Sequence, residues 1–383
     1  MNIKPCYKSI NDNLTFVKQQ NAVNAFLAEN PRAEIIDLGI GDLKLPPVKA
    51  VSRALKKGAC LITRRKTFKG YSPDFGYSFL REKISLDYKK AGEEVMPDEI
   101  FITDGAKGAI GALFDVIAAK NALILSPAYP LYKDLCLACG VNVRFACGES
   151  FCEFPLPPED FSPDLIFICS PNNPTGGVMR DELFEKYVDY ALKCGALIVF
   201  DSAYYDFARV KNRPFASSGA GACVAEVRSY SKGLSFTGLR CGFIALKREN
   251  PAYKAYKRRE LLHSNGVNFI SQYAAAASYE NSAIKQTKER VEFYRCNARV
   301  ISAYLTACGA NFCGGFDAPY ILLKTPCCGE KFAAKLLYEK GVAVTPGEGF
   351  GAENCVRISV FCSRKQAAAA GQKIAEFYAE RKL

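Results

Sequence analysis

One lysine lies in a loop whose neighbours are suited to binding an anion. Residues 228–233 read R-S-Y-S-K-G, and Arg240 follows Lys232 by eight residues. A lysine amine that is held rigidly can form a covalent bond to a carbonyl compound. The hydroxyls of Ser229 and Ser231 can donate to a phosphate, and a guanidinium binds phosphate through two parallel hydrogen bonds. The S-x-S-K motif alone is more typical of a loop with a solvated lysine. Together with Arg240, however, it predicts a carbonyl-reactive lysine beside a phosphate site.

Two other loops offer partners for an aromatic, protonatable ring. Asp201 directly follows the apolar residues 197–200, and a carboxylate at a buried strand end is costly unless it meets a cation. A protonated pyridine nitrogen is such a cation, and its protonation strengthens the ring as an electron sink. Tyr204 and Asn173, the latter in S-P-N-N-P-T-G-G at 170–177, could both hydrogen-bond a phenolate oxygen on that ring. The simpler interpretations are a helix cap at Asp201 and a structural turn at 170–177.

Three more positions would complete such a site. Tyr129 could stack its aromatic face on the ring. The strand–turn–helix junction at 103–108 would present the backbone N–H groups of Ala106 and Lys107 to a phosphate, unless the acidic residue there only caps the helix. Arg357 stands inside an apolar strand pattern, where the α-carboxylate of a substrate would pair with it. A surface-facing arginine on an edge strand is the alternative for that position.

The composition limits histidine and cysteine chemistry. The chain has 383 residues, with one histidine, His263, and 17 cysteines. A single histidine excludes most Ser-His-Asp and histidine–metal sites. The cysteines are odd in number and irregularly spaced, and only Cys136 and Cys139 form a C-x-x-C pair, which predicts reduced thiols and no metal. The chemistry is therefore expected from lysine, tyrosine, carboxylates or a cofactor.

Charge and hydropathy disfavour nucleic acid and membranes as partners. The net charge is +12, but the basic residues form only short, scattered clusters without a basic helix or a stacking platform. An anionic cofactor and a dicarboxylate substrate would suit this charge. No apolar run approaches the roughly 20 residues that span a bilayer, and residues 1–10 lack the apolar core of a signal peptide. We therefore expect a cytoplasmic protein.

The candidate residues follow apolar runs that would be strands of an α/β sheet. These runs alternate with helix-like stretches at 108–118, 132–139 and 181–194, as in a mainly parallel sheet flanked by helices. In such sheets the loops after the carboxyl ends of the strands build the ligand site. The expected strands are 99–103, 122–125, 142–144, 165–169, 196–200, 225–229 and 241–246.

Beyond residue 247 the pattern changes to that of a smaller α+β domain. A long helical region is expected from 251 to about 305, followed by strands at 320–324, 342–344 and 356–360 and a helix over 364–381. The length also favours two domains. We expect a large domain over 41–270, a small domain over 271–383, and an N-terminal segment, 1–40, that joins the small domain.

Together these motifs resemble the class I aminotransferases of fold type I, and the resemblance runs through almost the whole chain. It implies a pyridoxal 5'-phosphate (PLP) cofactor on Lys232, and amino acid and 2-oxo acid substrates. It also implies a homodimer with shared active sites, in which Tyr71 reaches the phosphate in the partner subunit's site and Gly41 lines the substrate pocket.

One subfamily is a closer match. The segments that resemble LL-diaminopimelate aminotransferase include L-G-I-G-D at 38–42, K-G-Y-S-P-D-F-G-Y at 69–77, D-G-A-K at 104–107 and S-N-G-V at 264–267. The resemblance implies amine transfer from glutamate to tetrahydrodipicolinate. A second cation in the site would suit such a substrate, which has a carboxylate at each end. The substrate contacts that it implies are Gly41, Lys107, Tyr129, Asn173, Asn265 and Arg357.

Two segments depart from that subfamily. Residues 14–22 lack the tyrosine and both arginines of its N-terminal substrate cover, and residues 347–354 are shorter than its late glycine-phenylalanine segment. Both departures lie on the substrate side, so a class I aminotransferase for aspartate, alanine or an aromatic amino acid is the alternative. A third hypothesis, a PLP-fold regulator or binding module, would need the lysine without the substrate arginine, or an attached DNA-binding domain.

Overall fold

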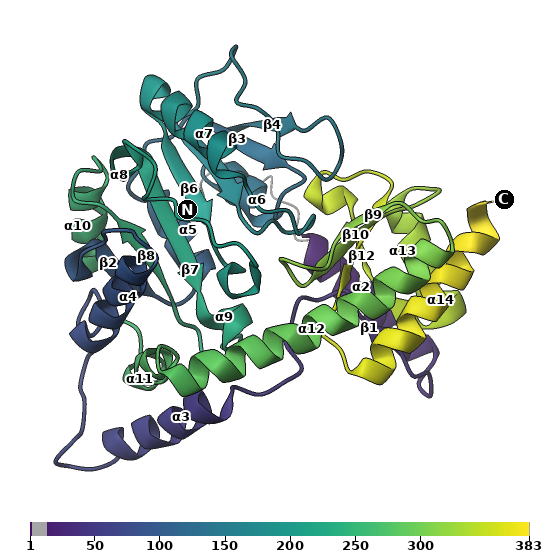
Figure 1. The fold of residues 1–383 in the computed structure, drawn as a ribbon, viewed down its shortest axis with the longest axis horizontal. Coiled ribbons are helices and arrows are strands. Elements are labelled where there is room, and N and C mark those ends of the chain that lie inside the picture. Colours follow the sequence, from purple (N-terminus) through teal and green to yellow (C-terminus); the bar gives the residue numbers. More distant parts are fainter. Residues whose placement is uncertain (2–13, 383) are drawn as a thin grey trace.

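A seven-stranded sheet organises the larger part of the chain, which we call the large domain (Figure 1). The computed structural model describes residue 1 and residues 14–382, so most of the segment 1–10, for which we expect no export signal, lies outside the described residues. In spatial order the strands are β2 (Ile100–Thr103), β8 (Gly242–Leu246), β7 (Val224–Ser229), β6 (Leu197–Asp201), β5 (Leu165–Cys169), β3 (Asn121–Ser126) and β4 (Asn142–Cys147).

The predicted mainly parallel sheet is confirmed. Strand β8 runs antiparallel to both of its neighbours, and the other pairs are parallel. Strand β5 shows why the apolar runs predicted strands. Its residues are all buried, with Phe167 packed on the face that holds Ile110 and the next residue, Ile168, packed with Phe184 on the opposite face. A strand that is covered on both faces reads as a continuous apolar run.

Helices cover both faces of this sheet. The helices of this domain are α3 (Lys49–Ile62), α4 (Ser78–Lys90), α5 (Ala106–Leu113), α6 (Leu131–Ala138), α7 (Asp181–Cys194), α8 (Ala220–Cys223), α9 (Tyr230–Gly233) and α10 (Tyr253–His263), of which α3 packs mainly on the later helix α11 (Phe269–Ala277). Helix α7 has the predicted bounds. Helix α5 ends earlier than predicted, because the chain leaves the helix in a tight turn in which Phe114 N–H bonds Gly111 and Val116 N–H bonds Leu113. None of the helices within residues 14–382 is long and apolar enough to cross a bilayer.

The smaller part of the chain, which we call the small domain, is built on a four-stranded antiparallel sheet. Its order is β12 (Thr345–Pro346), β13 (Cys355–Ser359), β10 (Tyr320–Lys324) and β9 (Phe312–Gly314), and a second sheet pairs β1 (Ile36–Asp37) with β11 (Val342–Ala343). The helices here are α2 (Thr15–Glu29), α13 (Gly329–Lys340) and α14 (Arg364–Lys382). Helix α2 packs Val23 and Phe26 against Leu337. The domain boundaries at residues 40 and 270 stay a prediction.

The long helical region predicted over 251–305 is in fact three helices. They are α10, α11 (Phe269–Ala277) and α12 (Asn281–Ala307). The first break is at Ser264, whose extended backbone (φ −132°, ψ 140°) ends α10, and Gly266 follows with a positive φ of 74°. Helix α12 passes from beside α11 to the small domain, where it packs along α14 (Figure 1). One helix therefore belongs to both parts of the molecule.

Several strands of the large sheet end together at one edge. The register pairs Cys169 of β5 with Asp201 of β6, and Asp201 with Val227 of β7. Because these strands are parallel, the loops after their carboxyl ends meet at that edge, as predicted. The ends of these strands and the loops after them contain part of the predicted site, namely Asn173, Asp201, Tyr204, Ser229, Ser231 and Lys232.

Candidate active site

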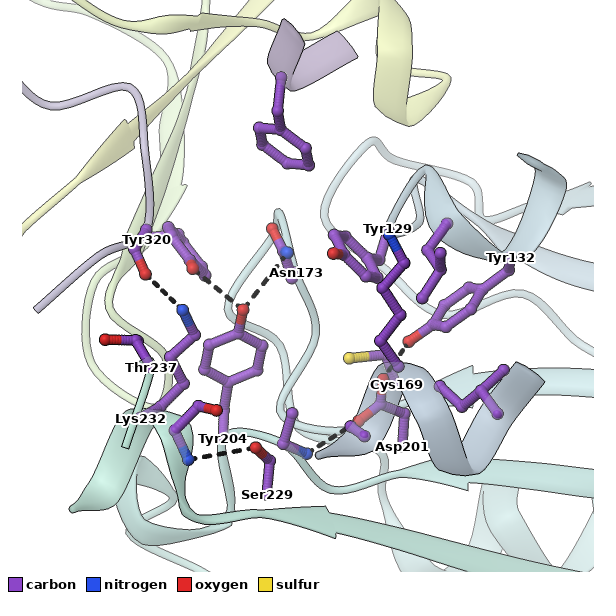
Figure 2. A pocket seen from close by; sticks show the side chains of 18 of the residues that line it. Tyr129, Tyr132, Cys169, Asn173, Asp201, Tyr204, Ser229, Lys232, Thr237 and Tyr320 are labelled. Atoms are coloured by element: carbon purple, nitrogen blue, oxygen red, sulfur yellow. Dashed lines mark hydrogen bonds between the residues drawn. The ribbon is translucent and has the colours of Figure 1, made fainter. Parts of the chain in front are cut away.

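A cavity of about 270 Å³ lies at this edge, between the large sheet and the small-domain sheet. Figure 2 shows side chains from both domains converging on it. Most of the predicted site residues line it, namely Gly41, Ala106, Lys107, Tyr129, Asn173, Asp201, Tyr204, Ser229, Ser231, Lys232, Arg240 and Arg357. Two predicted residues, Tyr71 and Asn265, do not line it within this single chain.

Lys232 lies on the short helix α9, which starts directly after β7. Ser229 begins that helix, and its hydroxyl accepts a hydrogen bond of 3.1 Å from the Ser231 N–H. The Lys232 ammonium donates to the carbonyl of Gly41 on the far wall of the cavity. Gly41 has no room for a side chain, because a Cβ atom there would lie 2.1 Å from the Tyr320 hydroxyl. The lysine amine thus lies at the wall of the cavity, fixed by the Gly41 carbonyl.

An anion-binding corner lies beside Lys232. Arg240, at a φ of 50°, donates from Nη1 to the Ser231 hydroxyl over 3.3 Å. Across the corner, helix α5 begins at Ala106 after Gly105, whose φ is 115°. A Cβ atom at position 105 would lie 2.4 Å from the Arg240 guanidinium, so only glycine lets the helix N-terminus and the arginine approach this closely. Free N–H groups, hydroxyls and a guanidinium suit a phosphate.

Asp201 is a buried carboxylate that faces no cation of the described chain. It is 4% exposed, and it accepts hydrogen bonds from the Tyr132 hydroxyl at 2.6 Å and the Ala203 N–H at 2.9 Å (Figure 2). Burial raises the pKa of Asp201, whereas these two hydrogen bonds lower it. No lysine or arginine among the described residues offsets the burial. A protonated pyridine nitrogen in the cavity would supply the missing positive charge.

Tyr204 and Asn173 converge on one point of the cavity. The Asn173 amide nitrogen lies 3.4 Å from the Tyr204 hydroxyl, which also lies 2.9 Å from the hydroxyl of Tyr320 (Figure 2). Burial raises the pKa of Tyr204 well above its usual value, so the phenol stays protonated and can donate. These groups suit a phenolate oxygen of a bound ring.

Arg357 is a buried guanidinium that does not use all of its hydrogen-bond donors. It is 1% exposed, and it donates to the Asn173 side-chain oxygen at 3.0 Å and to the Gly39 carbonyl at 2.7 Å. Its Nε has no hydrogen-bond partner among the described residues. The rings of Phe16 and Tyr320 lie 5.1 and 4.3 Å from the guanidinium carbon. A buried cation without an acidic partner suits a substrate carboxylate.

The cover of the cavity comes from helix α2. The Phe16 ring lies 6.1 Å from that of Tyr129 and 5.9 Å from that of Phe350. Burial raises the pKa of Tyr129 to about 12, so its phenol is neutral at physiological pH. An aromatic side chain therefore closes the cavity at the segment where the sequence departs from the LL-diaminopimelate subfamily.

Several residues that line the cavity were not singled out by sequence. They are Phe16, Ile40, Ile110, Leu131, Tyr132, Cys169, Ala203, Thr237 and Tyr320. Two of them had a usable signal. Tyr132 lies one helical turn beyond Tyr129, and Tyr320 opens a predicted strand in the same domain as Arg357. The others are apolar or small residues without a distinctive pattern.

Tyr71 and Asn265 lie together, away from the cavity. Tyr71 is 87% exposed, and Asn265 is also exposed. A Cβ atom at Gly266 would lie 2.8 Å from the Ser72 side chain, so the two segments are neighbours. They form a single surface patch in the described chain.

Comparison with known proteins identifies the family. Residues 33–374 match the family described as aminotransferase class I and II. The LL-diaminopimelate aminotransferase of Lachnospira eligens is 36% identical over 92% of this chain and 94% of its own length. That of Bacteroides fragilis is 35% identical over 92% and 93%.

Solved structures agree on the fold. The L,L-diaminopimelate aminotransferase from Chlamydomonas reinhardtii superposes with a TM-score of 0.92 at 27% identity, covering 99% of each chain. An aspartate aminotransferase from Thermus thermophilus with maleate gives 0.86 at 23% identity, also over 99% of each chain, and shows the fold alone.

Proposed function

The chain belongs to the class I and II aminotransferases, which are PLP enzymes, and we propose from this premise that it is an LL-diaminopimelate aminotransferase. It would transfer an amino group from glutamate to tetrahydrodipicolinate in its open keto form, giving LL-diaminopimelate and 2-oxoglutarate for lysine biosynthesis. The relatives at 35–36% identity that bear this name support the proposal. The structural observation that carries it is a pair of cations, Arg357 and Lys107, on one cavity. Such a pair suits a substrate with a carboxylate at each end.

The residues of the cavity would hold the cofactor at three points. Ser229, Ser231 and Arg240, with the N-terminus of α5, would bind its phosphate. Asp201 would pair with the ring nitrogen and keep it protonated, and Asn173 and Tyr204 would hydrogen-bond the phenolate oxygen. When bound, PLP supplies an electron sink for the bond that breaks at the substrate Cα.

Lys232 would carry the cofactor and then move the proton. Its amine lines the cavity and donates to the Gly41 carbonyl, which fixes its position in the site. With PLP bound, the Lys232 amine in its neutral form would act as the general base toward the proton at the substrate Cα. Tyr129, from the opposite wall, would restrict the ring to one plane.

Arg357 would bind the α-carboxylate through both donor branches. The Asn173 side-chain oxygen already orients its Nη1, and the Nε, which has no hydrogen-bond partner among residues 14–382, would be available for a second contact. Lys107, at the first turn of α5, would meet the distal carboxylate. Phe16 would exclude water above the substrate.

We further propose a cytoplasmic homodimer with shared active sites. Tyr71 and Asn265 would then serve the partner subunit's cavity, the first at the phosphate and the second at the substrate. The exposure of both residues on one patch supports this arrangement.

A second candidate differs only in the substrate. Phe16 presents an apolar ring where a polar cover is expected, which favours a substrate with an uncharged or shorter side chain, such as an aromatic amino acid, alanine or aspartate.

Consumption of 2-oxoglutarate would be followed with LL-diaminopimelate and with a panel of common amino acids. We expect LL-diaminopimelate to give the highest kcat/KM. A protein that uses the panel and leaves LL-diaminopimelate untouched would exclude the first proposal.

A further inference from the structure

Tyr320 is a buried tyrosine of β10 that reaches the cavity from the small domain. It is 1% exposed, and its hydroxyl lies 2.9 Å from that of Tyr204 (Figure 2). Within residues 14–382 this is the one hydrogen bond that the Tyr320 hydroxyl forms. The sequence motifs gave Tyr320 no role, although it lines the same cavity as Lys232. A buried hydroxyl with a single neighbour can affect the site only through that neighbour.

Packing holds the Tyr320 ring in one position. Its plane stands at 80° to that of Tyr204, with 5.3 Å between the ring centroids, and the centroid of the Phe361 ring lies 6.5 Å away. The guanidinium carbon of Arg357 lies 4.3 Å from the centre of the Tyr320 ring. Because these contacts involve the ring and not the hydroxyl, a phenylalanine would fill the same place. The hydroxyl can therefore be removed alone.

The neighbours of Tyr204 determine which way its hydrogen bonds run. The Asn173 amide oxygen accepts from Arg357 Nη1, so the end of the amide that faces Tyr204 is the nitrogen, which can only donate. A phenol has one proton to donate. If Tyr204 gives that proton to the ring oxygen of a bound cofactor, Tyr320 must be the donor in the contact between the two tyrosines. The cofactor would thus fix a direction that is open in the chain alone, where either hydroxyl can donate.

We propose that Tyr320 is a positioning residue, whose hydroxyl donates to that of Tyr204 and so strengthens the hydrogen bond from Tyr204 to the ring oxygen of the bound cofactor. Hydrogen bonds in a chain polarise one another, and each gains roughly 10–30% in strength. The inference rests on the role proposed above for Tyr204, and it does not depend on which amino acid is the substrate.

The expected consequence is a change in the acidity of the bound cofactor. When the cofactor is joined to Lys232, a proton is shared between the joining nitrogen and the ring oxygen, and the visible absorbance changes as that proton is lost. Donors to the ring oxygen favour the form in which it is a free phenolate. Tyr320 should therefore lower the pH at which the absorbance titrates, and removal of its hydroxyl should raise that pH.

Other charged and titratable side chains share the cavity with the two tyrosines. They are Tyr129 after β3, Cys169 on β5, Asp201 on β6, Lys232 on α9 and Arg357 on β13. Burial raises the pKa of the Cys169 thiol, so it stays neutral at physiological pH. All five are retained in every variant below, so a difference between the variants reports the tyrosine hydroxyls.

The test follows the visible absorbance of the full-length holoenzyme against pH, without substrate. Tyr320→Phe should raise the midpoint by about 0.2 to 0.6 unit, which corresponds to a gain of 10–30% on a charge-assisted hydrogen bond. Tyr204→Phe removes the whole bond and should raise the midpoint by about 1 to 2 units. Tyr279→Phe is the matched control. Its hydroxyl forms the same kind of bond, 2.8 Å from that of Tyr230, but lies outside the cavity, so the midpoint should not move.

A double variant shows whether Tyr320 acts through Tyr204. Tyr204→Phe/Tyr320→Phe should have the midpoint of Tyr204→Phe alone, because no hydroxyl remains at position 204 to relay the effect. An unchanged midpoint in Tyr320→Phe would overturn the proposal, as would a double variant in which the two shifts add. An unchanged midpoint in Tyr204→Phe would overturn both the proposal and the role proposed for Tyr204, so the two failures are distinct.

Discussion

Arg357 and Asn173 are joined by a hydrogen bond of 3.0 Å between the guanidinium Nη1 and the amide oxygen. The other end of the same amide lies 3.4 Å from the Tyr204 hydroxyl. One asparagine side chain therefore orients the proposed carboxylate-binding group and a proposed ring-binding group together. Its buried position, 2% exposed, leaves it a single useful orientation.

Arg357→Lys should weaken substrate binding strongly. Lysine keeps the charge but cannot reproduce the planar fork that Asn173 and Gly39 hold in place. Loss of a buried, charge-assisted contact costs about 2–5 kcal/mol, so kcat/KM should fall by at least about 30-fold, mainly through KM. Steady-state kinetics would measure this. Arg299→Lys, at an exposed arginine paired with Glu292, is the control, and an unchanged KM in Arg357→Lys would exclude the assignment.

Lys232→Ala should remove both turnover and the visible absorbance band of the covalently held cofactor. Loss of a proton-transfer group alone costs about 10²- to 10⁴-fold in rate. Lys373→Ala is a matched control, because the Lys373 ammonium also donates to a backbone carbonyl, that of Lys340, at 2.8 Å. A Lys232→Ala protein that retained the band and the rate would exclude this lysine.

Tyr132→Phe should shift the pH profile. Burial raises the pKa of Asp201, and the hydrogen bond from Tyr132 lowers it, so removal of the hydroxyl raises the pKa further. The site requires ionised Asp201, so the acidic limb of the kcat/KM profile should move to higher pH, with near-normal rates above it. Tyr187→Phe, which removes a buried hydroxyl bonded to the Pro155 carbonyl at 3.0 Å, should leave the limb in place.

Mixed dimers test the proposed sharing of sites. When Lys232→Ala and Tyr71→Ala subunits are mixed and refolded, one site of each hybrid carries both defects and the other carries neither. Activity should therefore reappear in the mixture. Mixing Lys232→Ala with Asp201→Asn should recover nothing, because both residues serve their own subunit's site. Equal rates in the two mixtures would rule out the shared site.

Glu93 should make stability fall as the pH rises. Burial raises its pKa to about 8, and its Oε2 has no hydrogen-bond partner within the described chain. The unfolded carboxyl ionises near pH 4.5 while the folded one stays protonated, so the free energy of unfolding is highest below that pH and is lost up to about pH 8. Glu93→Gln should flatten this dependence in urea titrations of the cofactor-free protein. Glu289→Gln, at an exposed position, should retain the slope of the unaltered protein.

The sequence was sufficient for the large sheet and for the residues that line one wall of the cavity. Buried parallel strands are continuous apolar runs, and the polar residues that follow them, such as Asp201 and Lys232, must then gather at one edge. Local chemistry therefore predicted much of the large-domain wall without any knowledge of distant contacts.

The other wall depends on contacts between residues far apart in the chain. Phe16 reaches Arg357 only because α2 packs on the small domain, and nothing in the amphipathic pattern of α2 distinguishes that side chain. The division of residues 251–305 into three helices also escaped prediction, because the short extended segment from Ser264 to Gly266 interrupts a stretch that otherwise reads as helix. Packing and single-residue breaks of this kind have no periodic signal.

Gly105 has a consequence for how this chain can change over time. Its missing side chain is what admits the Arg240 guanidinium to the start of α5. Any larger residue at position 105 displaces the arginine, and it must also adopt a φ of 115°, which L side chains rarely do. The glycine is therefore expected to persist even in a descendant that has lost the arginine, whereas a descendant that keeps the arginine in this place cannot give up the glycine.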